Sequence, residues 1–235
     1  MVCASLIKIL SIDTATPRVS VALLDGEELK AEIRLSWPET RSAHLLPSID
    51  YLLHEAGWRL QDLNLIAAGT GPGSFTGIRI GLSTALGLAQ SLRIPLAAVS
   101  GLDALACKAP YFAGRLGVAL DAQRSQVYYA EYEGWNGGYR RVIDPILLSP
   151  EELGRVTRAA GLRMIGDGAV IYADRFRAGR REWPRVLEVD LFAAAGIARL
   201  ALRRRRAWKT GAFLQAKPLY IRPPDALRPK PGGKK

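Results

Sequence analysis

Strand-like runs of apolar residues open the chain. The segments LIKILSI (6–12), VSVALLD (19–25) and ELKAEIRL (28–35) are separated by short polar turns, the second of which holds Asp25-Gly26. An Asp-Gly pair between two apolar runs is typical of a tight hairpin. The pattern predicts a three-stranded antiparallel meander.

The following part of the chain alternates between helical and strand patterns. Apolar residues recur at helical spacing over 40–56, namely at Leu45, Leu46, Ile49, Leu52, Leu53 and Ala56. A short buried strand is predicted over 63–69, then a helix to about Leu92 and another strand over 95–100. One βββαβα unit is therefore complete by about residue 100.

The second half repeats this order. A shift of 108 residues places Asp13 on Asp121 and Val19 on Val127, and in both copies the Asp ends a strand before a polar turn. A third strand is predicted over 138–148, and Ser149-Pro150-Glu151-Glu152 is a typical helix start. We expect an internal duplication with lobes at 1–100 and 101–222 and a basic, flexible tail at 223–235. The last helix is free in this scheme to pack back on the first lobe.

A glycine-rich stretch, GTGPGSFTGIRIG (69–81), joins the buried strand to the following helix. It lacks the lysine of a P-loop, misses the dinucleotide fingerprint by one position, and does not match a nucleophile elbow at Ser74. The strand–turn–helix context permits anion binding without specifying it. Within the helix, small residues recur every four positions at Gly73, Gly77, Gly81, Ala85 and Ala89. Close packing against a helix or the sheet is the favoured interpretation, and ligand contact stays open.

Candidate chemistry rests on few residues. Asp13 and Asp121 could hold a hydrated magnesium and a nucleotide between the lobes, or each could simply cap its own turn, and the second interpretation is favoured. The two histidines, His44 and His54, are ten positions apart on one predicted helix, about 15 Å, which is too far to share an ion. No metal site and no catalytic constellation is therefore predicted.

Charge is distributed unevenly along the chain. Residues 1–149 carry 13 Lys and Arg against 14 Asp and Glu, whereas residues 150–235 carry 20 against 8 and include RRRR at 203–206. This excess indicates either a polyanion partner such as RNA or a solvated helix end followed by a basic tail. No apolar run is long enough to span a membrane. The N-terminal apolar stretch is interpreted as a strand and not as a signal peptide. The two cysteines form neither a disulfide framework nor a metal-binding spacing, which favours a cytoplasmic protein.

Several segments together resemble one protein family. ILSIDTATPRVSVALLDG (9–26), the run from Ala67 to Ala106 around GPGSFTGIRIG, and VALDAQRSQVYYAEY (118–132) are similar to the TsaB family, also called YeaZ. MIGDGAVIYADRF (164–176) and KPLYIRPPDA (217–226) support the resemblance. It implies the two-lobed α/β fold of actin, Hsp70 and the sugar kinases, a ribonuclease H-like architecture, in agreement with the duplication.

The resemblance also implies a function. Members of the family act in forming N6-threonylcarbamoyladenosine on tRNA, as non-catalytic partners of a catalytic paralogue, TsaD, together with a small ATPase, TsaE. The helices at about 41–56 and 75–92 are expected to form a bundle with TsaD or with a second copy of the chain. The partner-binding residues expected on them are Leu45, Ile49, Leu52, Gly77, Gly81, Ala85 and Ala89. We therefore expect Gly81→Leu to abolish TsaD binding while leaving the fold intact.

Some features depart from active members of the wider fold. Ala15 stands where working kinases of this fold usually have glycine, so turnover of ATP is not expected, and Asp13, Thr14 and Asp121 could make at most a weak contact with ATP or ADP and magnesium. The alternatives are a nucleotide-dependent phosphotransferase using Asp13 and Asp121, or a tRNA-binding module using the basic last third.

Overall fold

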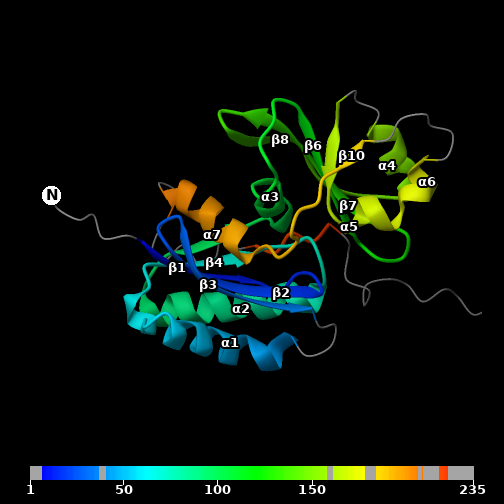
Figure 1. Cartoon of the computed structure of the whole chain (residues 1–235). Helices are drawn as coiled ribbons and strands as arrows, with labels where there is room; N and C mark the ends of the chain where they lie inside the picture. The colour runs from blue at the N-terminus through cyan, green and yellow to red at the C-terminus, as the bar shows by residue number, and fades with distance from the viewer. Residues whose placement is uncertain are drawn as a thin grey trace, which may run out of the picture.

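The computed structural model describes residues 7–36, 41–157, 161–177, 184–205, 208 and 217–221. Within them, two lobes each carry one five-stranded mixed sheet (Figure 1). The first lobe is built from β1 (Lys8–Asp13), β2 (Arg18–Asp25), β3 (Glu28–Ser36), α1 (Arg41–Glu55), the 3₁₀ helix η1 (Leu60–Asp62), β4 (Leu65–Gly69), α2 (Phe75–Leu92) and β5 (Leu96–Val99). The tail at 223–235 lies outside the described residues.

The second lobe follows through α3 (Gly101–Ala106). Its elements are β6 (Arg115–Asp121), β7 (Val127–Trp135), β8 (Gly138–Leu148), α4 (Pro150–Val156), β9 (Arg163–Ile165), α5 (Asp167–Ile171), α6 (Ala173–Arg177) and β10 (Arg185–Val186). The last helix is α7 (Ala194–Arg203). The predicted start of α4 is confirmed, because Ser149 and Glu152 form a reciprocal capping box and Pro150 opens the helix.

The two sheets have the same topology. The first runs β3-β2-β1-β4-β5 and the second runs β8-β7-β6-β9-β10. In each, the first two pairings of the meander are antiparallel and the next strand along the chain pairs parallel to the first. The predicted duplication and the two-lobed α/β fold class are therefore confirmed.

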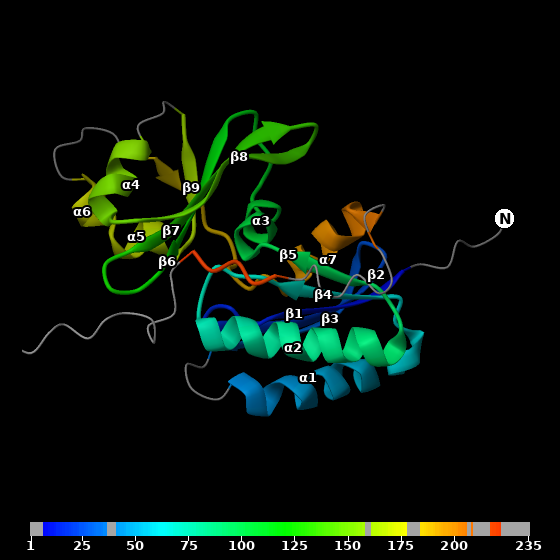
Figure 2. The same ribbon diagram turned by 180° about the vertical axis from the view of Figure 1, so that it is seen from behind.

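The helices form layers around the first sheet. Both views show α1 and α2 side by side on one face of this sheet and α7 on the other (Figures 1 and 2). α3, which joins the lobes, packs against both the second sheet and α7. The backbones of α7 and α3 approach so closely that a Cβ on Gly196 would lie 2.6 Å from the Ala104 carbonyl oxygen.

The hydrophobic core continues from one lobe to the other. One cluster fills the space between the two sheets and includes Ile9 and Leu65 of the first, Leu116 and Val118 of the second, and Ile197 of α7. A second cluster lies between the first sheet and α1 and α2, and a third under α4 and α5. The lobes share buried apolar surface, which holds the segments between them in a defined arrangement.

Candidate functional site between the lobes

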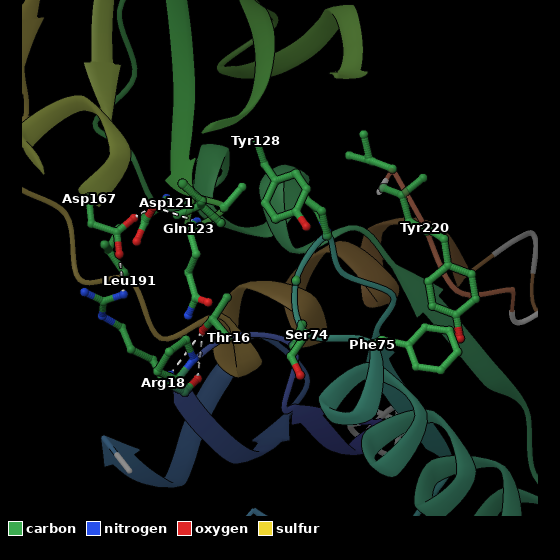
Figure 3. Close-up of a pocket in the computed structure, with 18 of the residues that line it drawn as sticks. Thr16, Arg18, Ser74, Phe75, Asp121, Gln123, Tyr128, Asp167, Leu191 and Tyr220 are labelled. Carbon is green, nitrogen blue, oxygen red and sulfur yellow. Dashed lines mark hydrogen bonds and ion pairs between the residues drawn. The ribbon is translucent and has the colours of Figure 1, made fainter. Parts of the chain in front are cut away.

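A cleft of about 370 Å³ separates the two lobes where their strands end (Figure 3). Parallel strands that end at the same sheet edge bring their following turns together, and ligands of open α/β folds bind at such edges. Polar residues line the cleft from turns or helix starts after β1, β4, β6 and β9, from neighbouring strands and from the segment 217–221. They are Thr16, Arg18, Ser74, Thr76, Asp121, Gln123, Tyr128, Asp167 and Tyr220.

Asp13 and Thr14 lie beneath this cleft and not in its lining. Both side chains are almost fully buried. The Asp13 carboxylate accepts a hydrogen bond from the Ala15 amide at 3.3 Å, which is the turn-capping role that the sequence favoured. The Thr14 hydroxyl donates to the Gly77 carbonyl at 2.6 Å and so joins the first turn to α2. The expectation that these two residues contact a nucleotide is corrected by their burial.

Asp121 does face the cleft, but its carboxylate also has partners. One of its oxygens accepts hydrogen bonds from the Gln123 amide at 2.8 Å and from the Tyr172 hydroxyl at 2.7 Å. Burial, followed by this bond to Asp121, raises the pKa of the Tyr172 phenol. Asp121 therefore caps its own turn as Asp13 does.

Asp167 and Arg18 are cleft residues that the sequence did not single out. One Asp167 oxygen accepts from the Asp121 amide at 2.9 Å, and the other pairs with Arg18 Nη1 at 2.7 Å, across the cleft (Figure 3). Asp167 lies in MIGDGAVIYADRF (164–176), a segment that supports the family resemblance without marking this carboxylate. Arg18 carries no signal in the sequence, because only the folded chain brings it to residue 167.

The glycine-rich turn packs directly on the turn that follows β1. The Ser74 amide donates to the Ala15 carbonyl at 2.7 Å, and a Cβ on Gly73 would overlap that same carbonyl. Ser74 Oγ accepts from the Gly77 amide at 3.2 Å and caps α2. The close-packing interpretation of these glycines is therefore confirmed, since two of the amides at this helix start bind the chain itself.

A segment near the C-terminus, 217–221, forms one wall of the cleft. The Leu219 amide donates to the Thr70 carbonyl at 2.8 Å. The Tyr220 ring stacks on Phe75 with centroids 4.9 Å apart, and its hydroxyl accepts from Arg79 Nε at 3.1 Å. Residues far apart in the sequence thus meet at the start of α2.

The seven residues expected to bind a partner are all buried in the first lobe. They are Leu45, Ile49, Leu52, Gly77, Gly81, Ala85 and Ala89. A Cβ on Gly81 would overlap the Thr14 hydroxyl, so the small residues of α2 allow close contact with β1 and its turn. The two predicted helices are present, but these seven residues face the core and not the surface.

Two further findings concern metal binding and membrane-spanning helices. Among the residues that the structure describes, no three His, Cys, Asp or Glu side chains gather in a way that could hold a metal ion. In the same part of the chain, no helix combines the length and the apolar character needed to cross a bilayer.

The two duplicated sheets, the last helix α7 packed back on the first sheet, and the cleft between the lobes define a protein of the actin-like, sugar-kinase-like class. A family model described as TsaD, tRNA N6-adenosine threonylcarbamoyltransferase, matches residues 39–189. The tRNA threonylcarbamoyladenosine biosynthesis protein TsaB of Escherichia coli is 33% identical over 96% of this chain and 99% of its own length. The Bacillus subtilis protein of the same name is 38% identical over 57% of this chain and 59% of its own. The chain belongs to the TsaB family.

Solved structures agree with this assignment. YeaZ from Pseudomonas aeruginosa matches with a TM-score of 0.77 and 31% identity, over 92% of this chain and all of that one. The activator of 2-hydroxyisocaproyl-CoA dehydratase from Clostridium difficile matches with a TM-score of 0.51 at 10% identity, over 85% of this chain and 96% of that one, and shows the shared fold alone.

Proposed function

We propose that this chain acts in the formation of N6-threonylcarbamoyladenosine on tRNA as a non-catalytic subunit that binds the catalytic paralogue TsaD. The observation that carries the proposal is the likeness to TsaB over nearly the full length of both chains. A cytoplasmic location and the ATPase TsaE as a further partner are part of the same proposal.

The site residues support a non-catalytic role. A nucleoside triphosphate with magnesium needs open amides and carboxylate oxygens at the strand turns. Here the Ser74 amide is bound to Ala15, Asp13 is buried, and Asp167 pairs with Arg18. The residues present do not fit that ligand well, and no catalytic step is assigned to them.

The partner surface is proposed on the outward sides of α1 and α2. Leu46 and Tyr51 of α1 are large apolar side chains that are 58% and 57% exposed, and the proposal assigns them to the contact with a partner. On α2, Gly87 is exposed and a Cβ built on it would meet nothing within 4 Å. A helix of a partner could approach closely at this point.

Co-purification of the full chain with TsaD of its own organism tests this surface. We expect the Gly87→Leu variant and the double variant Leu46→Ser/Tyr51→Ser to fail to co-purify with TsaD. We also expect both variants to fail to support threonylcarbamoylation of tRNA. The matched control is Val170→Ser/Ile171→Ser, which removes two equally exposed apolar side chains from α5 in the other lobe. Undiminished TsaD binding by both α1 and α2 variants would contradict the proposed surface, whereas no effect of the wild-type chain on the modification would contradict the function itself.

The phosphotransferase alternative has its own test. Of the two aspartates that this alternative uses, Asp121 lines the cleft where a nucleotide could reach it, and Asp13 does not. Calorimetry of the chain with Mg-ATP is expected to show no micromolar binding. Binding with turnover that Asp121→Asn removes would overturn the non-catalytic proposal.

A further inference from the structure

Aromatic and arginine side chains gather at the tip of the β7–β8 hairpin, away from the cleft residues described above. The hairpin turns at Asn136-Gly137, both with positive φ, as a tight two-residue turn requires. Trp135, just before the turn, is 52% exposed, and Tyr111 on the neighbouring loop is 50% exposed. We call Tyr111, Trp135, Tyr139, Arg140 and Arg203 the hairpin-tip cluster.

Ring contacts order this cluster. The Arg140 guanidinium lies 4.4 Å from the centroid of the Trp135 ring and pairs with Glu133 at 3.0 Å. The Tyr139 ring lies 6.1 Å from that of Tyr111, and its hydroxyl donates to the Pro110 carbonyl at 2.7 Å. The flat surfaces are thus held in place before any ligand arrives, which lowers the entropy lost on binding.

The basic end of α7 reaches the same hairpin. A Cβ built on Gly138 would lie 3.9 Å from Arg203 Nη1, so this guanidinium sits beside the hairpin turn (Figures 1 and 2 show α7 ending below β8). Arg203 is exposed and has no ion-pair partner among the described residues. Arg204, its neighbour, is used within the fold and pairs with Asp103. The first two arginines of RRRR therefore differ: Arg204 is structural, and Arg203 is available to a ligand.

Charge around the cluster favours an anionic partner. Arg140, Arg141, Arg163, Arg203 and Arg204 lie in or next to it, against the three carboxylates Glu133, Asp103 and Asp144. Exposed aromatic rings beside the guanidinium of Arg203, which has no ion-pair partner among the described residues, fit a nucleic acid with unstacked bases: a base stacks on a ring and a phosphate contacts Arg203. In a duplex the bases are stacked inside the helix, so a duplex could bind the cluster only through contacts between its phosphates and the arginines.

We infer that the hairpin-tip cluster binds single-stranded RNA, with a base stacked on Trp135 and a phosphate held by Arg203. This inference rests on the proposed function only in taking the RNA to be the loop of a tRNA. It gives a role to Arg203, an arginine of the basic last third for which the fold supplies no ion-pair partner among the described residues.

Fluorescence anisotropy of the full chain with a labelled tRNA anticodon stem-loop tests the inference. We expect Trp135→Ala to weaken binding by about tenfold or more, because one base loses its stacking surface. Arg203→Gln should weaken binding and reduce the salt slope by about 0.7, the value for one phosphate contact on a single strand. The matched controls are Ile171→Ala, an equally exposed apolar residue on α5, and Arg155→Gln, an exposed arginine on α4, and neither should change the affinity. Thermal unfolding of each variant checks that the fold is kept.

Each outcome bears on the inference separately from the function. Undiminished binding by Trp135→Ala, an equal loss in Arg155→Gln, or equally tight binding of a fully paired RNA duplex would overturn it. In those cases TsaD co-purification and threonylcarbamoylation by the wild-type chain would still uphold the proposed function. RNA binding through the cluster without any support of the modification would leave this inference standing and remove the function.

Discussion

Two glycines of α2, Gly81 and Gly87, have opposite roles in the packing of this helix. Gly81 faces the sheet, where the Thr14 hydroxyl occupies the space that a Cβ would need. Thr14 is buried and its hydroxyl is bound to the Gly77 carbonyl, so it has little freedom to move. Gly87, six positions later, faces open space. Helix propensity alone would favour alanine at both positions.

The substitutions Gly81→Ala and Gly87→Ala should therefore change stability in opposite directions. We expect Gly81→Ala to lower the free energy of unfolding by about 1–3 kcal/mol through overpacking, and Gly87→Ala to raise it by about 0.5–1 kcal/mol. Urea denaturation of both variants measures the difference. Equal stabilisation by both would contradict the packing assigned to Gly81. For the same reason, Gly81→Leu is expected to damage the fold and is no test of partner binding.

At the scale of elements, α3 holds the second lobe and α7 together through one buried carboxylate. Asp103 accepts hydrogen bonds from the Tyr132 hydroxyl at 2.9 Å, from Arg141 at 3.0 Å and from Arg204 at 3.3 Å. These partners belong to β7, to β8 and to the residue that ends α7. Burial, followed by the charge of Asp103, raises the pKa of the Tyr132 phenol well above its ordinary value, so this hydroxyl stays a donor.

Loss of this carboxylate should loosen three elements at once. We expect Asp103→Ala to cost about 2 kcal/mol, because the buried Tyr132 hydroxyl loses its acceptor while both arginines keep partial access to water. The matched control is Asp144→Ala, which removes an exposed partner of the same Arg141 and should cost under about 0.5 kcal/mol. Chemical denaturation compares them, and similar losses in both would argue against a special role for Asp103.

At the scale of the whole molecule, the chain returns from its last segment to the first lobe. The segment 217–221 is held there by the Leu219 amide and by the stack of Tyr220 on Phe75. Arg79 reinforces the stack, because its guanidinium lies 3.7 Å from the centroid of the Phe75 ring. One wall of the cleft therefore depends on contacts between residues more than 140 positions apart.

Removal of the Tyr220 ring should release this wall without unfolding the lobes. An aromatic pair contributes about 1 kcal/mol, so we expect Tyr220→Ala to raise amide hydrogen exchange at Leu219 roughly fivefold, with little change in Tm. Tyr51→Ala on α1 is the control and should leave exchange at Leu219 unchanged. Unaltered protection in Tyr220→Ala would mean that the ring does not hold the segment.

The sequence by itself determined the element order of the first lobe, the meander that opens the second lobe, the duplication, the start of α4 and the close-packing role of the glycine turn. These features depend on local periodicity, on caps and on turn chemistry, which neighbouring residues carry. The family resemblance was also present in the sequence, because whole motifs carry it.

Only the tertiary structure decided which residues face the cleft and which face of each helix is exposed. Leu45 and Leu46 are adjacent and equally apolar, yet one is buried and the other is 58% exposed. Asp13 and Asp121 occupy equivalent turns, yet only Asp121 lines the cleft. Arg18 meets Asp167, and Arg203 meets the β7–β8 hairpin, through packing between the lobes. Such contacts depend on the shared core that brings distant segments together, and no local pattern in the sequence records them.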